Sequence, residues 1–121
     1  MSAIDPPAAA MRLRLQTDLK AAMRDRRTAE VSLLRVLIAA LDNTEAVPMT
    51  AEHQKYVVLP FGDGSAEVPR RVLSVADVRA VLEREQAERR AAADELERVG
   101  RPDVARERLV EVVLIERYLA G

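Results

Sequence analysis

The sequence predicts an all-α fold whose four main helices form two antiparallel hairpins, a small helical bundle. Three observations lead to this prediction. The composition is rich in alanine, leucine, arginine and glutamate, which favour helix, and it holds only two tyrosines, one phenylalanine and no tryptophan. Apolar residues recur at intervals of three and four in four separate segments. Polar breaks, prolines and a glycine separate these segments, and one domain is expected over residues 9–121.

The first two helices are predicted over residues 9–25 and 28–43. Residues 1–8 contain two adjacent prolines and are expected to form a flexible arm before the first helix. A polar break separates the two helices, and Thr28 is a candidate N-cap for the second. Each helix carries one apolar face, made of Leu15, Leu19, Ala22 and Met23 in the first and of Val31, Leu34, Leu37, Ile38 and Leu41 in the second.

Residues 44–73 do not fit a helix, because three prolines and two glycines interrupt them. Two apolar runs, at 56–59 and 68–73, flank the glycine-containing turn at 61–65. This pattern predicts a short β-hairpin-like insertion between the second and third helices. The exposed strand edges of such an insertion can pair with another chain. Residues 44–73 are therefore a candidate surface for a homo-oligomer.

The third and fourth helices are predicted to form the second hairpin. Ser74 and Asp77 form a variant capping box at the start of the third helix, and Gly100 marks its end. Pro102 suits the first turn of the fourth helix, which follows a tight turn. The third helix carries a heptad-like seam of Val75, Val78, Leu82, Glu85, Arg89, Ala92, Leu96 and Val99, and the fourth carries Val104, Leu109, Val112, Val113 and Leu119.

The residue inventory predicts neither catalytic residues nor a metal or other cofactor. The chain has no cysteine, which excludes disulfides, thiolate metal sites and thiol catalysis. His53 is the only histidine, so neither a ligand set nor a histidine-based general base has a second imidazole to work with. No apolar run approaches the ~18 residues of a membrane span. The lack of cysteine agrees with a reducing compartment, and a cytoplasmic protein is expected.

Positive charge is concentrated in the first predicted helix and the turn after it. Residues 12–27 hold six lysines and arginines against two aspartates, although the net charge of the whole chain is −1. Such a patch has two interpretations. It can bind phosphate groups, with an affinity that falls as salt rises, or it can be an ordinary solvated helix face. On the residue pattern alone, the solvated face is the better interpretation.

Charged residues also interrupt the apolar stripes. Glu85 and Arg89 lie four residues apart in the seam of the third helix, and Arg35 borders the stripe of the second. Charges on a core-facing stripe are costly unless they are paired. We therefore expect a semi-buried ion network in which Glu111 or Glu116 of the fourth helix takes part. The alternative is a groove whose charges are available to a partner.

A series of short segments keeps its order and spacing over most of the chain outside the arm and the insertion. It consists of residues 19–24 and 34–45, then Glu85, Gln86, Arg89 and Arg90, the turn at 100–103, and finally Glu107, Glu111, Leu114, Tyr118 and Leu119. This series resembles the YqeY family, which is related to the tail region of the GatB subunit of tRNA-dependent amidotransferases. The resemblance implies an all-helical domain linked to tRNA, and amidation chemistry that belongs to other domains of that enzyme.

The resemblance leads to a functional prediction. The chain is expected to be a non-catalytic accessory domain that binds tRNA, an amidotransferase or another tRNA-handling protein. Its candidate contacts are Lys20, Arg24, Arg26, Arg27, Arg89, Arg90 and Arg101. Two features depart from the family: the C-terminal helical subdomain expected after Leu119 is absent, and the 44–73 insertion is longer than expected. They leave open an alternative, a protein-interaction or self-assembly module that uses residues 44–73 and binds no nucleic acid.

Overall fold

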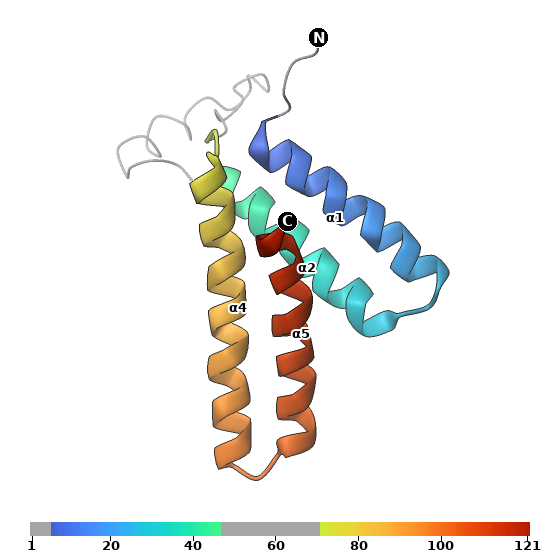
Figure 1. Cartoon of the computed structure of the whole chain (residues 1–121), viewed down its shortest axis with the longest axis vertical. Coiled ribbons are helices and arrows are strands. Elements are labelled where there is room, and N and C mark those ends of the chain that lie inside the picture. The colour runs from blue at the N-terminus through green and yellow to red at the C-terminus, as the bar shows by residue number, and fades with distance from the viewer. Residues whose placement is uncertain (1–5, 47–70) are drawn as a thin grey trace, which may run out of the picture.

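The computed structural model describes residues 6–46 and 71–121, which form four helices and contain no strand. These helices are α1 (Pro7–Arg24), α2 (Thr28–Ala46), α4 (Val75–Arg98) and α5 (Pro102–Ala120). Helices α1 and α2 form one antiparallel hairpin and α4 and α5 form the other. The first hairpin lies across one end of the second (Figure 1). The predicted all-α class is therefore confirmed for this part of the chain.

Two predicted boundaries are wrong. Helix α1 begins at Pro7, inside the predicted arm, because proline suits the first turn of a helix and the next residue, Ala8, is buried. Residues 44–46 belong to α2 and not to the insertion, and there the Thr44 hydroxyl donates a hydrogen bond to the Ala40 carbonyl at 2.8 Å. Residues 1–5 of the predicted arm and residues 47–70 of the predicted insertion lie outside the described residues. The described end of the second apolar run, residues 71–73, contains no strand, and Leu73 is buried in the core instead.

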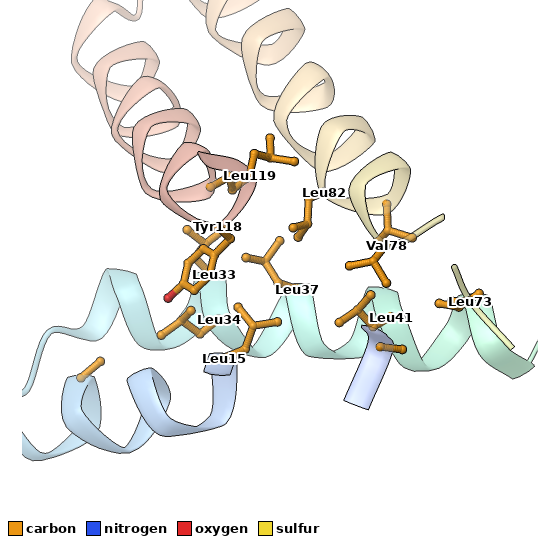
Figure 2. Packing of buried hydrophobic residues seen from close by; sticks show 14 residues of the cluster. Leu15, Leu33, Leu34, Leu37, Leu41, Leu73, Val78, Leu82, Tyr118 and Leu119 are labelled. Atoms are coloured by element: carbon orange, nitrogen blue, oxygen red, sulfur yellow. The ribbon is translucent and has the colours of Figure 1, made fainter. Parts of the chain in front are cut away.

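The hydrophobic core lies where the four helices meet. Figure 2 shows Leu37 of α2 directed toward Leu82 of α4, with Tyr118 and Leu119 reaching the same region from the end of α5. Each long side chain buried there removes apolar surface from water, which stabilises the fold by about 1.5–3 kcal/mol. The largest fully buried side chains are Leu15, Leu33, Leu37, Leu41, Leu73, Leu82 and Ile115.

The half of the α4–α5 hairpin that lies away from this junction has a thinner interior. Its buried residues outside the main core include Ala93, Ala105 and Val112. Short side chains at a helix contact allow the two helices to pack closely. Several larger apolar side chains of this half, among them Val110 and Val113, are exposed instead.

The predicted seam of α4 is partly wrong. Val78 and Leu82 are buried as predicted, but Val75 and Val99 are 63% and 59% exposed, since the ends of the helix have fewer neighbours. Val81, which the seam omitted, is buried in the main core. Near the junction, α4 packs against α1 and α2 as well as α5. A single heptad-like seam describes one helix–helix contact. It therefore omits the additional side of α4 that is buried against α1 and α2.

The buried residues of α5 also differ from those that were predicted. Leu109 and Val113 of the predicted face are exposed. The side chains that reach the core are Ile115, Tyr118 and Leu119, which lie in the last two turns. Only Leu119 of these was predicted to face the core.

The start of α4 follows its local signal closely. The Asp77 N–H donates to Ser74 Oγ at 3.0 Å, and the Ser74 N–H donates to Asp77 Oδ2 at 2.9 Å, so the predicted capping box is confirmed. The hydrogen bonds from the Ser74 backbone and side chain hold the pKa of the Asp77 carboxyl below its ordinary value.

None of the helices in the described ranges is both long and apolar enough to cross a membrane.

We expect Leu37→Ala to lower the free energy of unfolding by about 2–5 kcal/mol, because it removes a fully buried side chain and leaves a cavity at the helix junction. Chemical denaturation followed by circular dichroism measures the change. The matched control is Val36→Ala, at a residue that is 43% exposed on the same helix, where a change within about 0.5 kcal/mol is expected. Equal losses in the two variants would contradict the assignment of the core.

Candidate nucleic-acid interface

Arg89 lies at the centre of an ion network between α4 and α5. Its Nη1 is 2.8 Å from Glu85 Oε1 and its Nε is 3.2 Å from Glu111 Oε1. Each of these three side chains is no more than 15% exposed. Arg108 Nε also lies 3.4 Å from Glu111 Oε1. The structure thus brings together three of the residues that the sequence predicted for a network, and adds an arginine that it did not identify.

The other two residues predicted for the network lie apart from Arg89. Glu116 accepts a hydrogen bond from Gln86 Nε2 at 3.0 Å, and the same amide donates to the Val112 carbonyl at 3.0 Å. Glu116 therefore belongs to a second polar contact between α4 and α5. Arg35 is exposed and forms no ion pair within residues 6–46 and 71–121.

The seven basic residues predicted to contact nucleic acid do not form one surface. Arg89 is neutralised between two carboxylates. Arg90 is on α4, and Arg101 lies at the tip of the α4–α5 hairpin, where its Nε is 3.9 Å from Asp103 Oδ1 (Figure 1). The remaining four, which we call the basic corner, lie at the end of α1 and in the turn into α2: Lys20, Arg24, Arg26 and Arg27.

The turn in the basic corner is a Schellman motif with an arginine in the left-handed position. The Arg26 N–H donates to the Met23 carbonyl at 3.2 Å, and the Arg27 N–H donates to the Ala22 carbonyl at 2.9 Å. Arg26 has a φ of 58°. Glycine is the usual residue there, because a side chain in this conformation costs roughly 1–2 kcal/mol.

Helix α4 ends in the same motif with the usual residue. Gly100 has a φ of 80°, and its N–H donates to the Glu97 carbonyl at 3.1 Å. The chain therefore contains one Schellman turn with glycine and one with arginine in the left-handed position. The effect of a substitution at one position can be compared with the reverse type of substitution at the other.

Three of the four basic-corner side chains have no acidic partner among the described residues. Lys20, Arg24 and Arg26 are all exposed. Lys20 and Arg24 are four residues apart, so they are neighbours on one face of α1. Arg27, by contrast, has Nη1 at 3.0 Å from each carboxylate oxygen of Glu30. The corner therefore presents an excess of positive charge that the fold does not use.

A cleft of about 180 Å³ opens beside the basic corner, between α1, α2 and the last turns of α5. We call it the arginine cleft, after the three arginines in its lining. Arg27 belongs to both the basic corner and the cleft, so the two surfaces are continuous. The polar residues of its lining are Arg14, Asp18, Arg27, Glu30, Arg117 and Tyr118.

One wall of the arginine cleft is a contact between α1 and α5. The Arg14 guanidinium lies 4.6 Å from the centre of the Tyr118 ring, and its Nη2 donates to the Arg117 carbonyl at 3.0 Å. The Tyr118 hydroxyl donates to Asp18 Oδ2 at 2.5 Å. Burial is the main cause that raises the pKa of Tyr118 above its ordinary value of 10.0, followed by the hydrogen bond and the charge of Asp18.

The sequence pattern did not predict this contact between α1 and α5. Asp18 and Tyr118 are 100 residues apart, and no local pattern in the sequence links them. Arg117 lies on a helix whose charges look like ordinary surface pairs. The only available signal is the arginine-rich stretch at 12–27, which includes Arg14 but does not show which way it points.

The described residues contain no group of three acidic or histidine side chains arranged to hold a metal ion. Comparisons of the chain with protein-family models, with curated proteins and with solved structures found no match. The features that bear on function are therefore the basic corner and the arginine cleft.

We expect Arg26→Gly to raise the free energy of unfolding by about 0.5–1 kcal/mol, because glycine relieves the left-handed strain but adds flexibility to the unfolded chain. Gly100→Ala should lower it by about 1 kcal/mol through strain alone, since an added Cβ at Gly100 meets no atom within 4 Å. Urea denaturation of both variants measures these changes. Destabilisation by Arg26→Gly would show that the arginine side chain stabilises the turn by more than its left-handed conformation costs, and would contradict the prediction.

We expect the free energy of unfolding to fall as the pH rises above 10.0, because Tyr118 keeps its proton in the folded state after the unfolded chain has lost it. The stability from this group is complete below the unfolded pKa and is lost toward the higher folded pKa. Tyr118→Phe should make the decline shallower in denaturation experiments across that range. Tyr56→Phe controls for the loss of a phenol as such, and an unchanged decline in Tyr118→Phe would contradict the prediction.

Proposed function

We propose that this chain is a non-catalytic helical module that binds RNA through the basic corner. The observation that carries the proposal is the excess of unpaired positive charge there. Lys20, Arg24 and Arg26 are exposed and have no acidic partner among the described residues. Phosphate groups of a nucleic acid supply the missing negative charge, and each contact releases a bound counterion.

The conformation of Arg26 supports the same function. Its left-handed φ costs free energy that glycine would avoid, and the chain uses glycine at the equivalent position of its other Schellman turn. A residue that strains the fold is more readily explained by what its side chain binds than by what it stabilises.

The other predicted contacts are less suited to this function. Arg89 is enclosed by two carboxylates, and a phosphate would have to replace at least one of them. Arg101 lies in the turn between α4 and α5, and this turn is at the end of that hairpin away from α1 and α2 (Figure 1). We therefore place the main contact at the corner and treat Arg90 and Arg101 as peripheral.

The resemblance to the YqeY family specifies the proposal further. It suggests tRNA as the RNA, a tRNA-dependent amidotransferase or another tRNA-handling protein as an associated partner, and the cytoplasm as the location. In that arrangement the chain contributes binding, and the chemistry belongs to its partner. Self-assembly through residues 44–73 stays a separate prediction, because most of that stretch lies outside the described residues.

We expect unmodified tRNA to bind this chain with an affinity that decreases steeply with salt. Three or four phosphate contacts give a slope of log K against log[salt] of about −2 to −4. Arg24→Gln should weaken binding and make that slope shallower by about 1, because it removes one phosphate contact. Fluorescence anisotropy with labelled tRNA at several salt concentrations measures both quantities.

The matched control for this experiment is Arg106→Gln, on an exposed arginine of α5 that has no ion pair among the described residues. Its salt slope should equal that of the unmodified chain. No binding at low salt, or the same loss in both variants, would refute binding through the basic corner.

A further inference from the structure

The arginine cleft contains unused hydrogen-bond donors and acceptors side by side. The Arg117 side chain is exposed and makes no ion pair with the described residues, and Arg14 engages the Arg117 carbonyl through Nη2. On the acceptor side, Asp18 receives the Tyr118 hydroxyl on Oδ2, which leaves Oδ1 for another donor. A bare phosphate would meet the arginines but be repelled by Asp18 and Glu30. The lining therefore suits a ligand group that both donates and accepts.

The size and position of the cleft restrict that group further. At about 180 Å³ it is smaller than the roughly 300 Å³ at which pockets for whole drug-sized ligands begin. It can enclose a flat ring system, while the rest of the ligand stays on the surface. Because Arg27 lines the cleft and belongs to the basic corner, a strand bound at the corner passes its entrance.

We propose that the arginine cleft binds one unstacked guanine base of the RNA strand whose phosphates lie on the basic corner, an inference that rests on the proposed function. Guanine offers two adjacent donors, N1–H and N2–H, and two adjacent acceptors, O6 and N7. The Asp18 carboxylate accepts from the donor pair through the free Oδ1 and the remaining lone pair of Oδ2, and the Arg117 guanidinium donates to the acceptor pair.

Arg14 supplies a surface on which the base stacks. Its guanidinium carbon lies over the Tyr118 ring, 4.6 Å from the ring centre, and unpaired bases commonly stack on guanidinium planes in RNA complexes. The contacts of Arg14 to Tyr118 and to the Arg117 carbonyl hold the plane in place before the RNA arrives. A fixed guanidinium loses little conformational freedom on binding.

The other bases fit the same groups less well. Adenine lacks the N1–H and presents an acceptor at that position, which the Asp18 carboxylate repels. Uracil has a single N–H between two carbonyl oxygens, so a carboxylate meets one donor and two acceptors. Cytosine has an amino donor beside an acceptor nitrogen. Asp18 is therefore the residue that selects guanine, and Arg117 adds to its affinity.

The test uses the full chain and short single-stranded uridine oligomers that carry one central guanosine, adenosine or cytidine. Isothermal titration at low salt should show the guanosine oligomer binding about fivefold or more tightly than the others, the lower range for one good bidentate contact. Asp18→Asn should remove this preference while binding to all oligomers stays salt-dependent. Arg117→Gln should reduce it, and Arg106→Gln on the same helix should leave it unchanged.

The outcomes separate this inference from the proposed function. Equal affinity for all the oligomers, with normal salt dependence, would overturn guanine recognition and leave RNA binding at the corner intact. A guanosine preference that survives in both cleft variants would also overturn it. No binding of any oligomer or of tRNA at low salt would overturn both proposals. If Asp18→Asn fails to fold by circular dichroism, Arg117→Gln decides, because that side chain is exposed.

Discussion

The two hairpins are held together at one junction, where α4 packs against α1 and α2 and where the last two turns of α5 are buried in the same core. Ile115, Tyr118 and Leu119 enter the core there. A helix end leaves its final carbonyl groups without intrahelical partners, which is costly near a core. Here two cationic side chains satisfy two of them: Arg14 of α1 donates to the Arg117 carbonyl at 3.0 Å, and Arg79 of α4 donates to the Leu119 carbonyl at 2.7 Å. Positive charge is also favoured at this end of the helix dipole.

This junction determines the shape of the arginine cleft. Because Arg14 reaches the carbonyl end of α5, its guanidinium is held against the Tyr118 ring. Asp18, one turn along α1, then lies within reach of the Tyr118 hydroxyl. The groups that we assign to base recognition are thus fixed by contacts that also stabilise the fold. Substitutions at Arg14 or Tyr118 affect both properties, whereas Arg117 lines the cleft with an exposed side chain and separates them.

The features that could be predicted from the sequence are those encoded within a few residues. The capping box at Ser74 and the glycine turn at Gly100 are local, and the structure contains both. Glu85 and Arg89 are one helical turn apart, so their pairing follows from spacing alone. The face of α4 that contacts α1 and α2 could not be predicted, because it depends on how one hairpin crosses the other. The same is true of the contact between Asp18 and Tyr118, and of the cleft beside it.

The partners of each arginine distinguish structural charges from charges available for binding. Arg89 is desolvated between helices, and its charge is neutralised by Glu85 and Glu111, so it fixes how α4 and α5 pack. Arg12 plays a similar part between α1 and α2, with Asp42 at 2.8 Å and with Glu45. The basic corner differs because three of its four side chains are exposed and have no acidic partner among the described residues. The left-handed conformation of Arg26 costs free energy that glycine would avoid, which fits a binding role for this side chain better than a structural one.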